Sequence, residues 1–284
     1  MVLTRSDVPA RGPAARELLA DLVADGDVVV LSGAGMSTES GIPDYRGETG
    51  RSRPSSPMTF QTFVGGVEAR RRYWARSHLG WRHMLRAAPN DGHRVVAELE
   101  RRGLVSGVIT QNVDGLHQAA GSGRVVELHG ALDRVLCLGC GERTRRVDLD
   151  ARLRAANPGW DARPTLVNPD GDVSLTDAET VSFTVVDCAA CGGVLKPDVI
   201  FFGETVPAGR VRECYDLVSD AGALLVLGSS LTVHSGRRFV RHAASHGIPV
   251  LIVNQGPTRS DPDALCRLDA PLGPTLLALL ETLP

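Results

Sequence analysis

The stretch Val28 to Gly47, VVVLSGAGMSTESGIPDYRG, decides the fold of this chain. Its apolar beginning ends abruptly at Gly33-Ala34-Gly35, as a buried strand does when it enters a phosphate-binding turn, and Ser37 and Thr38 supply hydroxyls just beyond. The dinucleotide fingerprint GxGxxG is not completed, because its third position is Thr38. Residues 41–47 are then rich in turn-forming types, so a plain helix is not expected there.

Four further short apolar segments also end in polar or glycine-rich turns. With the first, the five segments are residues 27–31, 105–110, 124–128, 223–227 and 249–253. Apolar runs of this length suit strands buried on both faces of a parallel sheet, and helix-like stretches such as 92–102 and 235–245 lie between several of them. This alternation predicts a doubly wound, Rossmann-like α/β domain in which the five turns meet at the carboxyl edge of one sheet.

Two regions interrupt the alternation, and we expect them to build a smaller domain over the sheet. Residues 51–90 begin polar and Pro-rich and then become helix-like, which predicts a helical insertion. Residues 134–195 contain four of the six cysteines and a long polar centre, which predicts a zinc-binding module. The Rossmann-like domain then comprises residues 1–50, 91–133 and 196–284.

The composition is that of an ordinary globular protein, and it excludes some classes of partner. The chain of 284 residues has 31 basic and 33 acidic side chains and a net charge of -2, so no nucleic-acid or membrane partner is expected. The first residues lack the apolar core of a secretory signal, and no apolar run approaches transmembrane length. We therefore expect a cytoplasmic protein, and a monomer.

Four cysteines form two CxxC pairs, Cys137 with Cys140 and Cys188 with Cys191. Four thiolates in this pattern are typical of a closed, tetrahedral zinc site with a structural role. Two disulfides or unrelated buried cysteines are the alternatives, but the paired spacing and an intracellular setting favour one zinc ion. The loop between the pairs exceeds the roughly 15 to 20 residues usual in such sites, so we interpret it as an elaboration.

Two of the predicted turns carry groups suited to a ribose and to acid–base chemistry. The turn Gln111-Asn112-Val113-Asp114-Gly115 offers two carboxamides and a carboxylate, which are good partners for ribose hydroxyls or an amide. His129 follows a predicted strand directly and precedes glycine, so its imidazole can be exposed at the crevice. It can act there as a base near neutral pH, or serve only as a structural hydrogen-bonding group.

Taken together, these residues resemble the sirtuin family of NAD-dependent protein-lysine deacylases. The matching segments occur in family order over nearly the whole chain: GAGMSTESGIPDYRG, TQNVDGLH, ELHG, the two CxxC pairs, LKPDVIFFGE, LGSSLTV and VNQGPT. Finer features are similar to class II of the family, which includes human sirtuin four and its bacterial relatives. These features are RYWARSHLGW, LHGALDRVLCLGCGE, NPDGDVSL and GPTRSD.

The resemblance implies transfer of an acyl group from lysine to ADP-ribose, with release of nicotinamide and O-acyl-ADP-ribose. His129 would be the general base, and Asn112 and Asp114 would complete the catalytic centre. The segment after GAG would be the flexible loop that clamps NAD. The residues implied to contact NAD are Gly33, Ala34, Gly35, Ser37, Thr38, Asp44, Tyr45, Arg46, Gln111, Asn112, Asp114, Gly228, Ser229, Ser230, Asn254, Gln255, Gly256 and Cys266.

The resemblance also implies acylated-lysine proteins or peptides as substrates. Tyr73 and Arg76 have the YxxR spacing by which desuccinylating sirtuins hold an acidic acyl group, although Arg76 could equally be an ordinary helix-surface residue. We therefore hypothesise a preference for negatively charged or bulky acyl groups over acetyl. A further segment would pair with the substrate peptide through main-chain hydrogen bonds; its contact residues are Val199, Phe201, Phe202, Gly203 and Glu204.

Other functions stay open at this point. NAD-dependent mono-ADP-ribosyltransfer would use the same activated ribose with a different nucleophile. A catalytically idle NAD sensor is disfavoured because His129, Asn112 and Asp114 are all present. A dehydrogenase is disfavoured because no acidic residue follows a second strand about twenty residues after GAG, where the adenine ribose would be held. The sequence does not decide whether the loop between the cysteine pairs reaches the acyl channel.

Overall fold

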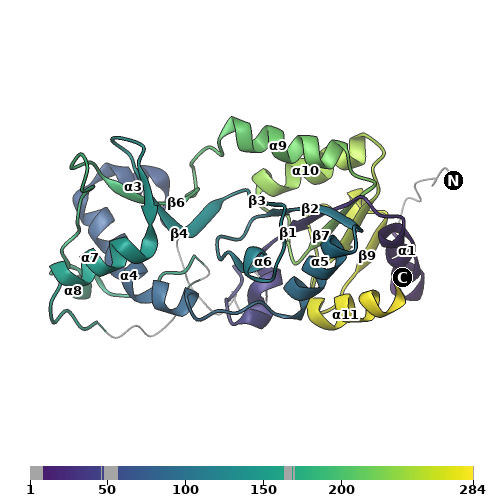
Figure 1. Cartoon of the computed structure of the whole chain (residues 1–284), viewed down its shortest axis with the longest axis horizontal. Helices are drawn as coiled ribbons and strands as arrows, with labels where there is room; N and C mark the ends of the chain where they lie inside the picture. Colours follow the sequence, from purple (N-terminus) through teal and green to yellow (C-terminus); the bar gives the residue numbers. More distant parts are fainter. Residues whose placement is uncertain (1–8, 46, 48–56, 163–167, 169, 284) are drawn as a thin grey trace.

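A computed structural model describes residues 9–45, 47, 57–162, 168 and 170–283 of the chain. Figure 1 shows an elongated molecule, with a large α/β unit at one end and a smaller module of helices and short strands at the other. Within the described ranges, no helix is both long and apolar enough to span a bilayer.

Six parallel strands form the large sheet, in the order β3-β2-β1-β7-β8-β9. Their bounds are β1 Val28–Ser32, β2 Val105–Thr110, β3 Val125–Glu127, β7 Ala223–Leu227, β8 Val250–Val253 and β9 Cys266–Leu268. The five predicted strands are confirmed, whereas β9 was missed because three residues around an arginine form no apolar run. The strand order reverses between β1 and β7, and a crevice forms at such a switch point.

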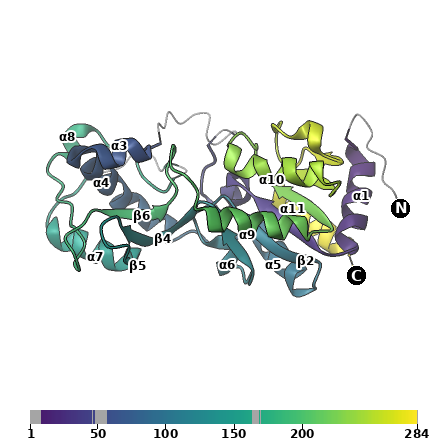
Figure 2. The same ribbon diagram turned by 90° about the horizontal axis from the view of Figure 1, so that it is seen from above.

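Helices cover both faces of this sheet, as Figures 1 and 2 show. Along β1, Val28 and Val30 pack into one core, and Val29 and Leu31 pack into the other, as the alternation of side chains along a strand requires. The first core is closed by α1 (Gly12–Ala24), α5 (Asp91–Arg101) and α11 (Leu272–Thr282), and the second by α9 (Ala208–Ser219) and α10 (His234–Ser245). The helices predicted at 92–102 and 235–245 are thus confirmed to within one residue.

The small module is built from both insertions, which share one hydrophobic core. Its antiparallel sheet has the order β5-β4-β6, and the fully buried Arg146 lies between Trp74 and Trp81, 5.3 and 5.4 Å from the two ring centroids. The domain limits given above remain predictions. The elements are α3 Phe60–Gly65, α4 Val67–Met84, β4 Gly130–Cys137, β5 Arg143–Arg145, α7 Arg146–Ala156, α8 Asp177–Thr180 and β6 Leu195–Val199.

Two buried histidines join α5 to α6 (Leu116–Ala119), the short helix after β2. The rings of His93 and His117 are 4.9 Å apart, and His117 Nε2 lies 2.9 Å from Ser32 Oγ at the end of β1. Burial lowers the pKa of His93 to about 4 and that of His117 to about 3. Both side chains are therefore neutral in the folded protein at neutral pH.

These two lowered pKa values predict that the protein is destabilised by acid. The unfolded chain takes up protons near pH 6.5, but the folded chain does not until about pH 4, so stability falls as the pH drops between these values. Each histidine should reduce the free energy of unfolding by about 1.4 kcal/mol per pH unit in this window. Urea denaturation at pH 6, 5.5 and 5 measures this slope.

The matched variant is His93→Gln, since glutamine is a favoured side chain at the third position of a capping box. It removes one titrating group, so the slope should become shallower by about 1.4 kcal/mol per pH unit. An unchanged slope would contradict this prediction, because it would mean that His93 takes up its proton at the same pH in the folded and the unfolded protein.

Candidate active site

A cavity of about 680 Å³ lies where the carboxyl edge of the large sheet faces the small module. The turns after β1, β2, β7 and β8 contribute Gly33, Gln111, Ser229 and Asn254 to its lining, and the link after β3 contributes His129. The five turns therefore meet in one place, as the sequence predicted. A cavity of this size suits a cofactor together with part of a substrate.

The turns after β1 and β7 are in direct contact at three glycines. Gly35 N donates a hydrogen bond to Gly228 O at 2.8 Å, and a Cβ added to Gly35 would lie 2.9 Å from Gly228 Cα. Gly228 has a φ of +61°, and a Cβ there would lie 2.5 Å from Met36 N. A Cβ on Gly33 would likewise meet Ser229 Cβ at 2.7 Å. The contact between the two turns therefore requires glycine at these positions, whether or not a phosphate also approaches them.

Polar side chains form a connected floor beside these glycines. Asn112 Nδ2 donates to Gly33 O and to Ser37 Oγ, both at 3.0 Å, and Ser37 Oγ donates to Asp114 Oδ2 at 2.7 Å. Gln111 Nε2 donates to Ser229 Oγ at 2.8 Å. Burial raises the pKa of Asp114, while its hydrogen bonds oppose the shift. The network fixes these groups before a ligand binds.

His129 lies on the two-residue link from β3 to β4, where the chain crosses from the large sheet to the small one. Its Nδ1 is 2.9 Å from the carbonyl oxygen of Gln111, so this nitrogen carries the proton and Nε2 is the accepting nitrogen. Ser235 Oγ lies 2.7 Å from Nε2. Burial lowers the pKa of His129, with the charges of Arg210 and Arg238 acting in the same direction. At neutral pH the ring is therefore a neutral base.

Ser235 is a contact that the sequence reasoning missed. It is the second residue of α10, and it is brought to His129 from 106 positions away in the sequence. The sequence did contain a signal for this contact. Ser235 begins the helix that was predicted after the β7 turn, and the first residues of such a helix face the carboxyl edge of the sheet.

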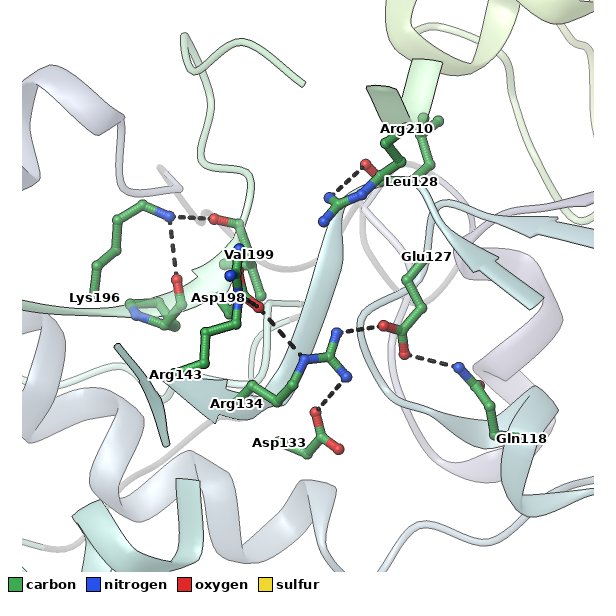
Figure 3. Close-up of polar contacts among 11 residues, drawn as sticks. Gln118, Glu127, Leu128, Asp133, Arg134, Arg143, Lys196, Asp198, Val199 and Arg210 are labelled. Atoms are coloured by element: carbon green, nitrogen blue, oxygen red, sulfur yellow. Dashed lines mark hydrogen bonds and ion pairs between the residues drawn. The ribbon is translucent and has the colours of Figure 1, made fainter. Parts of the chain in front are cut away.

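Charged side chains lie on the elements next to Leu128, the residue that precedes His129 on the link, as Figure 3 shows. Arg134 on β4 binds Glu127 at the end of β3, and its Nε lies 3.4 Å from Asp198 Oδ2 on β6. Arg210 of α9 donates to the carbonyl oxygen of Leu128 at 3.3 Å. The network joins the two sheets on either side of the base, so it restricts the position of His129.

The buried side chain of Lys196 anchors the segment that follows β6. Its Nζ donates to the carbonyl of Val199 and lies 3.1 Å from Glu204 Oε2, which also accepts from Phe201 N at 2.8 Å. Ile200 N donates to the carbonyl of His129 at 2.8 Å. The predicted peptide-binding segment is thus bonded directly to the residue that carries the base.

The chain after β1 does not continue as a plain α-helix because it has to cross to the small module. The 3₁₀ helix η1 (Ala34–Ser40) ends at Gly41, and Ile42 then packs into the small module's core. Asp44 and Tyr45 line the cavity, and the ring of Tyr45 lies 6.3 Å from that of Phe202. Arg46, also predicted to contact NAD, lies outside the described residues.

Three predicted residues do not line the cavity. Thr38 Oγ1 donates to Gly35 O at 3.0 Å, and Cys266 is buried in β9, where burial raises the pKa of its thiol to about 12. The guanidinium of Arg76 is bound by Asp172 and Val173. All other predicted catalytic, cofactor and substrate residues that the structure describes line the cavity, including Tyr73. The structure therefore gives Arg76 no free fork for an acyl carboxylate.

The four cysteines of the two pairs come together in the small module. Their Sγ atoms all lie within 4.8 Å of one another, with Cys137 to Cys191 at 3.5 Å and Cys140 to Cys188 at 3.9 Å. Tetrahedral ZnS₄ with Zn–S bonds of about 2.3 Å requires sulfur separations of about 3.8 Å, so the set fits one zinc ion. The backbone N–H groups of Gly139 and Cys140 point at Cys137 Sγ, at 3.3 and 3.5 Å, as they do in a knuckle that folds around a thiolate ligand.

We expect Gly228→Ala to disrupt the crevice. The methyl group would have to displace the backbone of Gly35 and Met36, so NAD affinity should fall at least about tenfold and stability by roughly 2 kcal/mol or more. Gly247→Ala is the matched control: it has a φ of +75° with no atom within 4 Å of the added Cβ, so it should cost only about 1 kcal/mol. Calorimetric titration with NAD and thermal unfolding of both variants distinguish the effect of the steric clash in Gly228→Ala from that of backbone strain, which both variants share.

Removal of zinc should loosen the small module. Atomic absorption is expected to find one zinc per chain, and Cys191→Ser or a chelator should lower Tm by at least about 5 °C, because metal binding contributes folding free energy. Addition of zinc should restore Tm after chelation but not in the variant. An unaltered Tm in metal-free protein would contradict a structural role.

Comparison with known proteins agrees with this geometry. Residues 33–235 match the model of the Sir2 family. The chain is 61% identical over 265 residues to NAD-dependent protein deacetylase 1 of Streptomyces coelicolor, covering 93% of this chain and 89% of that protein. It is 54% identical over 258 residues to NAD-dependent protein deacetylase 1 of Mycobacterium avium, covering 89% and 90%.

The fold is also similar to that of solved structures. A structure described as "Sir2-p53 peptide-NAD+" superimposes with a TM-score of 0.75 at 32% identity, over 93% of this chain and 96% of that one. A second, "Structure of Sir2Tm bound to a propionylated peptide", gives a TM-score of 0.73 at 30% identity, over 93% and 97%. The family match and these relatives span most of the chain, which therefore belongs to the Sir2, or sirtuin, family.

Proposed function

We propose that this chain is an NAD-dependent protein-lysine deacylase. The observation that carries the proposal is the placement of His129, which lines the cavity between the turns of the large sheet and the apolar residues of the small module. Its imidazole is buried and neutral, and Nε2 is the nitrogen that can accept a proton. The names of the relatives, NAD-dependent protein deacetylases, support the same activity. The finer similarity to class II remains part of the proposal, as do the cytoplasmic location, the monomeric state and the domain limits given above.

The lining fits NAD in its chemistry. The interlocked turns offer backbone amides and the hydroxyls of Ser229 and Ser230 to a diphosphate, and Asn254 to Gly256 would hold the adenosine. Gln111, Asn112 and Asp114 would hold the ribose and nicotinamide. When bound, NAD would supply the ADP-ribosyl group that accepts the acyl group, with nicotinamide as the leaving group.

His129 would act as general base through Nε2. The Gln111 carbonyl keeps the proton on Nδ1 and orients the ring, so Nε2 would accept a proton from a substrate hydroxyl that takes the place of the Ser235 hydroxyl. Because the pKa of His129 is lowered, the base is already unprotonated at neutral pH. Asn112 and Asp114, fixed by Ser37, would keep the reacting sugar within reach of the ring.

The substrate would be a peptide or protein segment with an acylated lysine. Phe202 is 41% exposed, which is unusual for a large aromatic side chain, and it lines the cavity together with the rest of the segment 199–204. A similar solved structure is described as "Sir2 bound to acetylated peptide", which supports an acylated peptide as the substrate. The acyl group would then enter the end of the cavity lined by the small module.

The direct test is incubation of the protein with NAD and acetyl- or butyryl-lysine peptides, with nicotinamide and peptide mass followed over time. We expect acyl-dependent release of nicotinamide and formation of O-acyl-ADP-ribose. His129→Ala should lower kcat at least about a hundredfold with little change in NAD affinity, because a general base contributes roughly 10² to 10⁴. Appearance of ADP-ribosylated protein without deacylation would favour the mono-ADP-ribosyltransferase instead, and NAD binding without turnover would favour a sensor.

A further inference from the structure

One positive charge in the lining of the cavity has no partner in the protein. Arg238, in the second turn of α10, is the one arginine or lysine among the lining residues that the structure describes. Its Nε is buried without a hydrogen-bond partner, and its two Nη atoms are accessible and take part in no hydrogen bond or ion pair with described residues. Because partial burial of an unpaired charge is unfavourable, the guanidinium is suited to an anionic ligand.

A second arginine near the base shows the contrast. After burial, the charges of Arg210 and Arg238 lower the pKa of His129, so both guanidinium groups lie close to this ring. Arg210 donates to the carbonyl oxygen of Leu128 at 3.3 Å, as Figure 3 shows. Arg210 is therefore engaged by the main chain, whereas Arg238 leaves its charge for a ligand.

Arg238 lies on the side of the cavity where the predicted peptide-binding segment enters α9. Figures 1 and 2 show α9 and α10 side by side, and Val206, Cys214 and Phe239, from the segment and the two helices, pack into one core. Side chains lean toward the N-terminus of their helix, which directs Arg238 toward the first turn of α10 and the cavity. A peptide that pairs with residues 199–204 would therefore reach the guanidinium.

The diphosphate of NAD is the other anion expected in this cavity, but other groups would hold it. The turns after β1 and β7 offer backbone N–H groups and the hydroxyl of Ser229. The atoms nearest to a Cβ on Gly33 or Gly35 belong to Gly228 and Ser229, so these turns are packed against each other. Arg238 instead lies among elements that flank the predicted peptide segment, which favours the substrate over the cofactor as its ligand.

The other charges of the lining make the position of an anion important. Asp44, Asp114, Asp170 and Glu204 also line the cavity, so carboxylates outnumber arginines among the described lining residues. Like charges repel and opposite charges attract, and both effects are strongest where water is partly excluded. A carboxylate of the substrate is therefore favoured where it reaches Arg238 and disfavoured elsewhere in the cavity.

We propose that Arg238 binds a carboxylate of the substrate protein, from an aspartate or glutamate that lies within a few residues of the acylated lysine and on one side of it. The inference rests on the proposed deacylase function and deepens it by naming the sequence context of the substrate. A guanidinium holds a carboxylate through two parallel hydrogen bonds, which gives the contact a defined geometry. The acyl group itself takes no part in this contact.

The test uses acetyl-lysine peptides in which a single glutamate is moved through the positions on either side of the lysine and alanine fills the others. Affinity by calorimetry and kcat/KM with NAD are each expressed relative to the all-alanine peptide. We expect glutamate to strengthen binding about fivefold or more at a position on one side, and to give no gain on the other. The gain should largely vanish in about 0.5 M salt, because ions screen an accessible charge pair.

Variants separate the charge of Arg238 from its packing. Arg238→Gln should abolish the glutamate gain, Arg238→Lys should keep part of it, and Arg238→Glu should make lysine the preferred residue at that position. Expressing each value relative to the all-alanine peptide removes the effect that a changed charge has on the pKa of His129. Arg241→Gln is the matched control, because Arg241 is an exposed residue of the same helix outside the cavity lining, and it should leave every ratio unchanged.

The outcomes distinguish this inference from the proposed function. A glutamate gain that is absent at every position, or that persists in Arg238→Gln, overturns the role of Arg238 even when the all-alanine peptide is deacylated. A loss of NAD affinity in Arg238→Gln without any change in the glutamate gain would assign the guanidinium to the diphosphate instead. A position-dependent gain in binding that needs Arg238 supports the carboxylate site even if turnover fails, and turnover of the all-alanine peptide reports on the deacylase function alone.

Discussion

The backbone contact between the turns after β1 and β7 is the constraint on which the rest of the site depends. It lies at the point where the strand order reverses, and the separation between Gly35 and Gly228 leaves no room for a Cβ. Because the two strands are neighbours in the sheet, this contact sets the position of Ser37 on one side and Ser229 on the other. The other polar groups at the base of the cavity are hydrogen-bonded to those two side chains.

His129 shows how a base can be positioned without being placed on a regular element. It lies on a short link between two sheets, yet its ring is held by the Gln111 carbonyl, and its main chain is bonded to Ile200. The ion pairs of Arg134 with Glu127 and Asp198 join the strands on both sides of the link. Burial keeps the ring neutral, so its geometry and its protonation state have the same structural origin.

The small module forms one end of the cavity, opposite the turns of the large sheet. The zinc-type cysteine cluster and the buried Arg146 stabilise a body of modest size, and that body presents Tyr73, Met84 and Leu132 to the cavity. Its long inter-cysteine loop is packed against α4 through Gly80, which brings the backbone at Gly171 into direct contact with the helix.

The sequence by itself determined the features that depend on local pattern. Apolar runs ending in polar turns predicted five of the six strands in the large sheet, and the CxxC spacing predicted the cysteine cluster, because periodicity and short spacings act within a few residues. The strand β9, the contact of Ser235 with His129 and the engagement of Arg76 by Asp172 were not predictable from it. Each depends on residues far apart in the chain, and only packing in three dimensions decides which of several possible partners a side chain meets.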